Sequence, residues 1–196
     1  MRRHVTLAMA MAAVASWATV VGAATVSVYT DKAAWEAALG APYLTEAFAD
    51  DVLNAGVSFV STESGHINPA EECYQDVLAS QSQNEPMTTW SFVPQTVAYG
   101  GTWTLGGPGG SGNSLLVYIP EFSLYVGAIG NSYYEEFWGL VSDTPFTSVR
   151  LVGGSGSNQQ NYKMDDMVYS PIPEPATLSL LALGAAGLAL TRRRQA

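Results

Sequence analysis

Few side chains in this sequence could bind zinc or act as a nucleophile. The 196-residue chain has one cysteine, Cys73, and two histidines, of which only His66 lies beyond the first 24 residues. Structural zinc sites usually combine several cysteine and histidine ligands, and nothing resembling the nucleophile motif G-x-S-x-G surrounds His66. We therefore expect neither a structural zinc site nor a Ser-His-Asp triad, and we predict that the protein is not an enzyme.

Carboxylates are far more numerous and could in principle form a catalytic pair. Glycosidases place two carboxyl groups roughly 5–9.5 Å apart. The sequence has three acidic doublets, which are Glu71-Glu72, Glu135-Glu136 and Asp165-Asp166. Adjacent side chains on a strand point to opposite faces of the sheet, so no doublet makes a catalytic pair by itself. A secreted hydrolase therefore stays a third reading of the chain.

The segment "YKMDDMVY" (162–169) raises a different possibility for the carboxylates. Strand alternation predicts that either Asp165 or Asp166 points into the core. A buried carboxylate needs hydrogen bonds, a cation, or a β-bulge that turns it outward. One reading is a bound structural Ca²⁺, held by Asp165 or Asp166 with help from Glu46 or Asp50. The other is a solvated edge pair or an aspartate that caps the backbone.

Aromatic side chains are the second candidate for ligand binding, because they can stack on sugar rings. We expect Trp90, Trp103 and Trp138 to fill the core of an all-β domain. Tyr133 and Tyr134, in the turn-like segment "GNSYYEE", are the pair that we expect to be exposed and available for ligand stacking.

The elements that must position these residues are mostly short strands. One helix is predicted between Asp31, a suitable N-cap, and Gly40, a suitable C-terminal cap. The rest is a series of short β-branched and aromatic runs separated by Gly, Pro, Asn and Ser. This pattern predicts an all-β, antiparallel, jelly-roll-like sandwich over residues 25–170, with residues 61–85 forming a long polar loop.

Charge is distributed unevenly along the chain. Between residues 25 and 172 there are only three basic residues against sixteen acidic ones. Such a domain repels phosphate backbones, which excludes nucleic acid as an expected partner.

Both ends carry apolar segments that predict export. Residues 1–24 have the charged, apolar and small-residue regions of a secretory signal peptide. At the other end, residues 171–196 contain Pro173-Glu174-Pro175, an apolar helix over 176–190 and the basic residues Arg192, Arg193 and Arg194. This fifteen-residue segment, apolar or small except for Thr177 and Ser179, is shorter than the roughly 17–25 residues of a stable membrane span. We expect a transient membrane insertion, oriented by the arginines with the domain outside.

This order of Pro-Glu-Pro, short apolar helix and basic end resembles the PEP-CTERM sorting signal of exported bacterial proteins. The resemblance implies recognition and processing by an exosortase. It also implies a Gram-negative host that makes exopolysaccharide and forms biofilms, with the protein at the cell envelope, surface or extracellular matrix.

The stretches "VAYGGTWTL", "FWGLVSDTPFTSVRLVGG" and "YKMDDMVY" are similar to uncharacterised PEP-CTERM proteins with one β-sandwich. The last stretch also resembles jelly-roll carbohydrate-binding modules with a structural calcium, which would favour Asp165 as a ligand. The function we expect is therefore a structural or adhesive protein associated with exopolysaccharide. A calcium-stabilised carbohydrate-binding module is the alternative.

Overall fold

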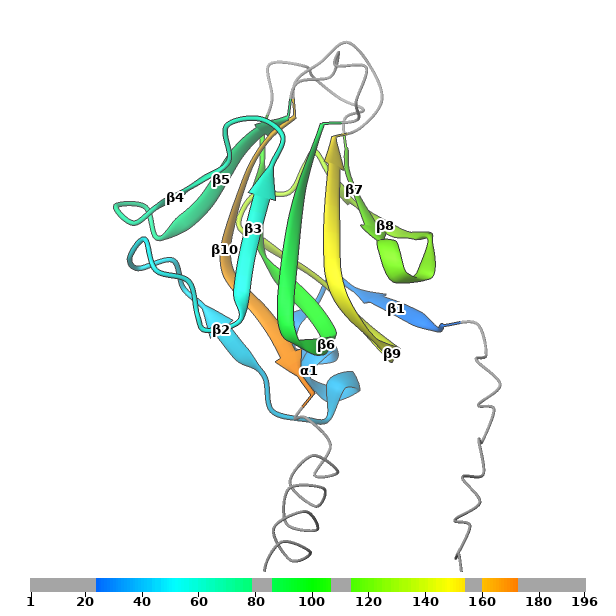
Figure 1. The fold of residues 1–196 in the computed structure, drawn as a ribbon. Helices are drawn as coiled ribbons and strands as arrows, with labels where there is room; N and C mark the ends of the chain where they lie inside the picture. Colours follow the sequence, from blue (N-terminus) through cyan, green and yellow to red (C-terminus); the bar gives the residue numbers. More distant parts are fainter. Residues whose placement is uncertain (1–23, 79–85, 107–113, 154–159, 173–196) are drawn as a thin grey trace, which may run out of the picture.

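The computed structural model describes residues 24–78, 86–106, 114–153 and 160–172 (Figure 1). The predicted signal peptide, apart from residue 24, and all of the Pro-Glu-Pro motif, apolar segment and arginines lie outside these ranges. Across the four described ranges, no helix has the length and apolar character needed to cross a membrane.

The described chain is mostly antiparallel β-structure. Its strands are β1 (Val26–Tyr29), β2 (Leu44–Glu46), β3 (Val57–Ser61), β4 (His66–Asn68), β5 (Cys73–Leu78), β6 (Met87–Leu105), β7 (Ser114–Ile119), β8 (Leu124–Gly130), β9 (Glu136–Gly153) and β10 (Gln160–Pro171). The helical elements are α1 (Lys32–Leu39) and the 3₁₀ turn η1 (Pro120–Phe122). All nine strand pairings of the described residues are antiparallel. The predicted all-β antiparallel fold with one short helix is confirmed.

The sheet is continuous but forms two layers, and the long strands β6 and β9 each run through both. The strand order is β4-β5-β10-β6-β9-β7-β8, with β1 on β9, β2 on β10 and β3 on β6. The first part of β6 pairs with β3, and its second part pairs with β10. Register shifts on both sides of Thr96 separate the two parts where β6 runs beside β9. Such irregularities bend strands, so the sheet folds over itself into a sandwich (Figure 1).

The two layers enclose an aromatic core. Trp90 and Trp103, from the two parts of β6, and Trp138 from β9 are at most 1% exposed. The rings of Tyr74 and Phe59 pack around Trp90 with centroid distances of 4.9 and 5.2 Å. Large buried aromatic rings supply much of the apolar area that stabilises a domain of this size. The predicted core role of the three tryptophans is confirmed.

Helix α1 covers the outer face of one layer. The Asp31 side chain accepts a hydrogen bond from the Ala34 N–H at 2.7 Å, and Gly40 ends the helix with a φ of 59°. Both caps agree with the sequence prediction. The fully buried Trp35 donates its indole N–H to the Leu140 carbonyl on β9 at 2.9 Å. This bond fixes the helix against the sheet.

The expectation of a long loop over residues 61–85 is wrong. That segment contains β4 and β5, and β5 pairs with β10 over five residues. Tyr74, Asp76 and Leu78 of β5 face the core, and Gln75 and Val77 face outward. The sequence does not show the apolar–polar alternation of a strand here, because Asp76 occupies an inward position that is normally apolar.

A β-bulge resolves the conflict in the Asp165-Asp166 doublet. On β10, Asp165 pairs with Thr102 and Val168 with Gly100, so β10 carries one extra residue against β6. Asp166 takes a φ of 46° and is exposed, and Asp165 is half-buried. The bulge therefore turns a carboxylate outward, which is one of the three solutions that the sequence left open.

Candidate functional site

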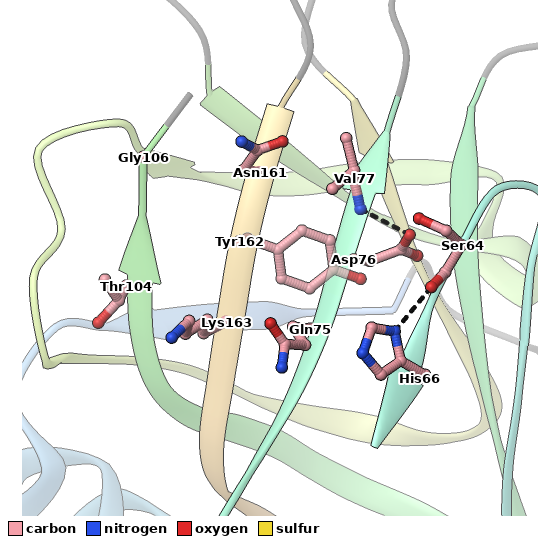
Figure 2. Close-up of a pocket in the computed structure, with 10 residues that line it drawn as sticks. All are labelled: Ser64, His66, Gln75, Asp76, Val77, Thr104, Gly106, Asn161, Tyr162 and Lys163. Carbon is pink, nitrogen blue, oxygen red and sulfur yellow. Dashed lines mark hydrogen bonds between the residues drawn. The ribbon is translucent and has the colours of Figure 1, made fainter. Parts of the chain in front are cut away.

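A row of polar side chains crosses four neighbouring strands, β4, β5, β10 and β6, on the outer face of the layer that they form. His66 on β4 pairs with Gln75 on β5, Gln75 pairs with Lys163 on β10, and Lys163 pairs with Thr104 on β6. Directly paired residues share a face of the sheet. The four side chains are therefore neighbours on one outward surface (Figure 2).

This row forms part of a shallow pocket of about 320 Å³. The lining residues come from β4, β5, β6, β10 and the segment before β4, and they are Ser64, His66, Gln75, Asp76, Val77, Thr104, Gly106, Asn161, Tyr162 and Lys163. Most carry a hydrogen-bonding side chain, and Asn161 Oδ1 has no hydrogen-bond partner among the described residues. The pocket suits a polar ligand.

The charged groups at the pocket are neutralised by the protein itself. Lys163 forms an ion pair with Glu71, and the hydrogen bond from that pair raises the pKa of Lys163. The Nδ1 atom of His66 lies 2.9 Å from the carbonyl oxygen of Ser64 (Figure 2). In the neutral imidazole, a hydrogen bond to a carbonyl places the proton on Nδ1 and leaves Nε2 as an acceptor. The surface thus offers hydrogen bonds rather than net charge.

A hydrogen-bonded carboxylate lies beneath the pocket. Asp76 is 2% exposed. Its Oδ2 accepts hydrogen bonds from the hydroxyls of Thr88 at 2.6 Å and Ser61 at 2.7 Å. The Tyr74 hydroxyl donates to the same atom at 3.1 Å, and the Val77 N–H donates to Oδ1 at 2.7 Å. Four donors therefore satisfy a buried carboxylate, as its position requires.

Two tyrosines extend this network toward the pocket. The Tyr162 hydroxyl donates to Thr88 Oγ1 at 2.6 Å. Burial raises the pKa of both Tyr74 and Tyr162, and the nearby Asp76 carboxylate adds to the increase. Both phenols are therefore held in the protonated form that can donate. With its oxygens occupied, Asp76 is arranged to hold β3, β5 and β6 together rather than to act as a base.

The residues proposed as calcium ligands have separate backbone partners. The buried Glu46 accepts from the N–H of Phe48 at 3.0 Å and of Asn54 at 2.6 Å, one on each oxygen. Asp50 accepts from the Val52 N–H at 2.8 Å. Within the described ranges, no group of three or more His, Cys, Asp or Glu side chains is placed to hold a metal. Calcium binding stays a prediction.

Asp165 has a different environment from Glu46 and Asp50. Burial raises its pKa, and the neighbouring carboxylates of Asp166, Glu72 and Glu135 raise it further, against a hydrogen bond from the Asp166 N–H that lowers it. A carboxyl group surrounded by like charges binds a proton or a cation more readily than an isolated one.

Tyr133 and Tyr134, the pair predicted for ligand stacking, differ in exposure in the folded domain. Tyr134 is 71% exposed, as expected. Tyr133 is half-buried and packs against the core, and its carbonyl accepts from the Leu105 N–H at 2.9 Å. The two rings therefore differ in exposure, and Tyr133 is the less accessible of the pair. A stacking role for Tyr134 stays a prediction.

Sequence reasoning missed the pocket because half of it lies in the segment assigned to a loop. Gln75 and Asp76 become neighbours of Lys163 and Tyr162 only through the pairing of β5 with β10. The signal was present as Tyr, Asp and Leu at alternate positions in "CYQDVL". It indicates a strand once the inward carboxylate is allowed to be hydrogen-bonded.

Comparison with known proteins bears on the end of the chain. Residues 171–194 match the family model of the PEP-CTERM protein-sorting motif. Curated protein sequences give no match. Among solved structures, a mutant family 29 carbohydrate-binding module, made to probe ligand recognition, has 12% identity and a TM-score of 0.45, over 69% of this chain and 99% of that one. The chain thus carries at its C-terminal end the PEP-CTERM sorting motif, which implies processing by an exosortase and is found on exported cell-surface proteins.

Proposed function

We propose that this protein is a structural or adhesive component of the envelope or extracellular matrix of a Gram-negative bacterium, and that it associates with exopolysaccharide. The sorting motif at residues 171–194 is the observation that carries the proposal. It supports delivery of the β-domain to the outside of the cell, where exopolysaccharide is the abundant polymer. In this role the domain binds and does not catalyse.

The pocket on β4, β5, β6 and β10 supports binding of a polar polymer. Its side chains offer amide, hydroxyl and imidazole groups, and its one lysine is already paired with Glu71. Sugar hydroxyls both donate and accept hydrogen bonds, so such a surface suits them. The polar row is solvent-facing, which gives a modest affinity per site and favours retention through many copies along one polymer.

Co-sedimentation with exopolysaccharide tests this proposal. Protein exported by cells that express the full-length chain is mixed with purified exopolysaccharide of the producing strain and then centrifuged. We expect the protein in the pellet, and a Gln75→Ala variant with a normal melting temperature should pellet less. If the wild-type protein stays in the supernatant at every polymer concentration, the association with exopolysaccharide is wrong.

A calcium-stabilised carbohydrate-binding module is the alternative, and the surroundings of Asp165 favour it. The carboxylates of Asp166, Glu72 and Glu135 raise the pKa of Asp165, and a bound cation would relieve that repulsion. Addition of EGTA should then lower the melting temperature by several degrees, because a ligand that binds only the folded state stabilises it. A melting curve that is identical with EGTA and with added Ca²⁺ would remove the alternative.

A further inference from the structure

A second row of side chains crosses the opposite layer of the sandwich. Val60 on β3 pairs with Thr89 on β6, and Thr89 pairs with Arg150 on β9. Arg150 pairs with Tyr118 on β7, and Tyr118 pairs with Tyr125 on β8. The neighbours Trp90, Val149 and Val117 belong to the core. The row therefore faces outward across five strands, which Figure 1 shows side by side.

The end of this row at β7 and β8 is aromatic and accessible to solvent. The rings of Tyr118 and Tyr125 lie 4.9 Å apart between centroids at an interplanar angle of 54°. Tyr125 is 50% exposed, and Val60 at the other end is 71% exposed. Tyrosine rings are rigid and amphipathic, so they offer contact area at a low cost in side-chain entropy. This row, called the strip from here on, thus has exposed apolar surface at each end.

Arg150 lies at the centre of the strip, between Thr89 and Tyr118. Within the described ranges its guanidinium forms no ion pair and no hydrogen bond, and its Nε atom is buried and unsatisfied. Buried donors that lack an acceptor are costly and uncommon in folded proteins. A planar guanidinium is the side chain that best matches a carboxylate.

Among the described residues, the face around Arg150 has one neighbouring carboxylate, that of Glu121, although the domain is strongly acidic. The described residues include fifteen acidic and three basic side chains. The flanking rows of this face, which the strand register places on either side of the strip, are Ser58, Ser91 and Ser148, and Met87, Val152, Leu116 and Ala128. Glu121, at the border, is engaged by Thr147 and Ser148. This face is therefore less negatively charged than the rest of the described surface.

We propose that the strip formed by Thr89, Arg150, Tyr118 and Tyr125 binds a polysaccharide that carries carboxylated sugars. The tyrosines contact the sugar rings, and Arg150 pairs with a sugar carboxylate. This inference rests on the proposed association with exopolysaccharide, and it adds a site distinct from the pocket and a chemical class of ligand.

The net negative charge of the domain does not prevent such binding. Stacked sheets lie about 10 Å apart, whereas the Debye length is about 8 Å at physiological ionic strength. Exposed carboxylates on the outer face of the other layer therefore lie more than one Debye length from the strip, and dissolved salt weakens their repulsion of an anionic polymer. A charge pair on a partly desolvated surface, flanked by aromatic contacts, is the arrangement that dominates many binding sites.

Affinity electrophoresis with two defined polymers tests the inference. Exported protein from cells expressing the full-length chain is run in native gels that contain sodium alginate, a polyuronate, or dextran, which is neutral. We expect retardation by alginate and little by dextran. Arg150→Gln, Tyr118→Ala and Tyr125→Ala should each weaken the apparent affinity for alginate about tenfold or more, as expected for central interface residues.

Matched control variants separate the strip from general effects. Lys32→Gln removes the same charge from α1, and Leu44→Ala removes an exposed apolar side chain from β2, which pairs with β10 in the other layer. Both controls should bind alginate as the wild type does. Melting curves verify folding, and Tyr118→Leu replaces Tyr118→Ala if the alanine variant fails to fold, because leucine keeps the apolar packing without the flat ring.

Each outcome decides the inference. Loss of binding in the strip variants alone supports it. Equal retardation by dextran and alginate, equal effects of strip and control variants, or absence of binding to alginate overturns it. If alginate does not bind but the protein still pellets with exopolysaccharide of the producing strain, the site inference fails and the proposed function stands.

Discussion

Asp76 is the residue on which the polar contacts of the core converge. Hydroxyls from Ser61, Tyr74 and Thr88 all reach one of its oxygens. Those residues come from β3, β5 and β6, so one side chain ties together strands of both layers. Buried polar networks of this kind specify how elements align, provided that every member is satisfied.

Replacement of Asp76 tests this role at the level of one side chain. Asp76→Ala leaves three hydroxyl donors without an acceptor, two of them buried and that of Ser61 half-buried, and each buried unsatisfied group costs about 1–3 kcal/mol. We expect urea denaturation to show a free energy of unfolding lower by about 3 kcal/mol or more. Asp51→Ala removes the same charge from an exposed side chain and should change stability by less than about 0.5 kcal/mol. Similar values for the two variants would contradict the account.

Glu121 makes a second prediction, which concerns pH. Burial alone would raise its pKa, but hydrogen bonds from Thr147 and from backbone N–H groups outweigh it, and the net pKa is lowered. A lowered folded-state pKa gives stability that is present above the unfolded value of about 4.3 and is lost as pH falls through the folded value. Melting temperatures should therefore fall less steeply for Glu121→Gln than for the wild type below about pH 4.5. A constant offset between the two proteins at every pH would show that the carboxylate charge contributes nothing.

The bulge in β10 is the decisive local feature at the scale of elements. It places Asp166 at a φ of 46°, which only glycine adopts readily and which Asp and Asn tolerate. The inserted residue lets Met164 and Met167 both reach the core, where each is 0% exposed, although three positions separate them. Regular alternation would have put them on opposite faces.

Two substitutions at this position test the bulge. Asp166→Gly keeps the backbone conformation accessible and should change the free energy of unfolding by less than about 1 kcal/mol. Asp166→Val removes the same charge but forces a β-branched residue into the left-handed region, and it should lower stability by about 1–2 kcal/mol. Thermal or urea denaturation of the pair measures the difference. Equal stability of the two variants would mean that the strand does not require this conformation.

Elements were predictable where local chemistry alone determined them. The caps at Asp31 and Gly40 specify α1 without help from the rest of the chain. The long strands β6 and β9 were predicted as shorter separate strands, because Val93-Pro94 and Thr144-Pro145 lie inside them. Proline is accommodated at bends and bulges, which are tertiary features that no local pattern contains. β5 was not predicted for the same reason, because its pairing with β10 is a tertiary feature, and the pocket that β5 helps to line was therefore missed as well.

At the scale of the whole molecule, the fold brings together side chains that are far apart in the sequence. His66, Thr104 and Lys163 meet through strand pairing, and so do Val60, Arg150 and Tyr118. The sequence supplied the fold class and the sorting motif, because periodicity and a contiguous motif are local signals. It could not supply the two surface rows, because strand order and register depend on packing across the whole sheet.

The central claim is that the chain is delivered and processed as a sorted exported protein, and intact mass tests it most directly. The protein is expressed full-length in a host with an exosortase and recovered from the culture and envelope fractions for mass spectrometry. The account predicts a mature form that lacks the first 23 or 24 residues and has lost the arginine-rich end after cleavage near Pro173-Glu174-Pro175. A mature protein that still ends with Arg192–Arg194 and the two residues after them would contradict it.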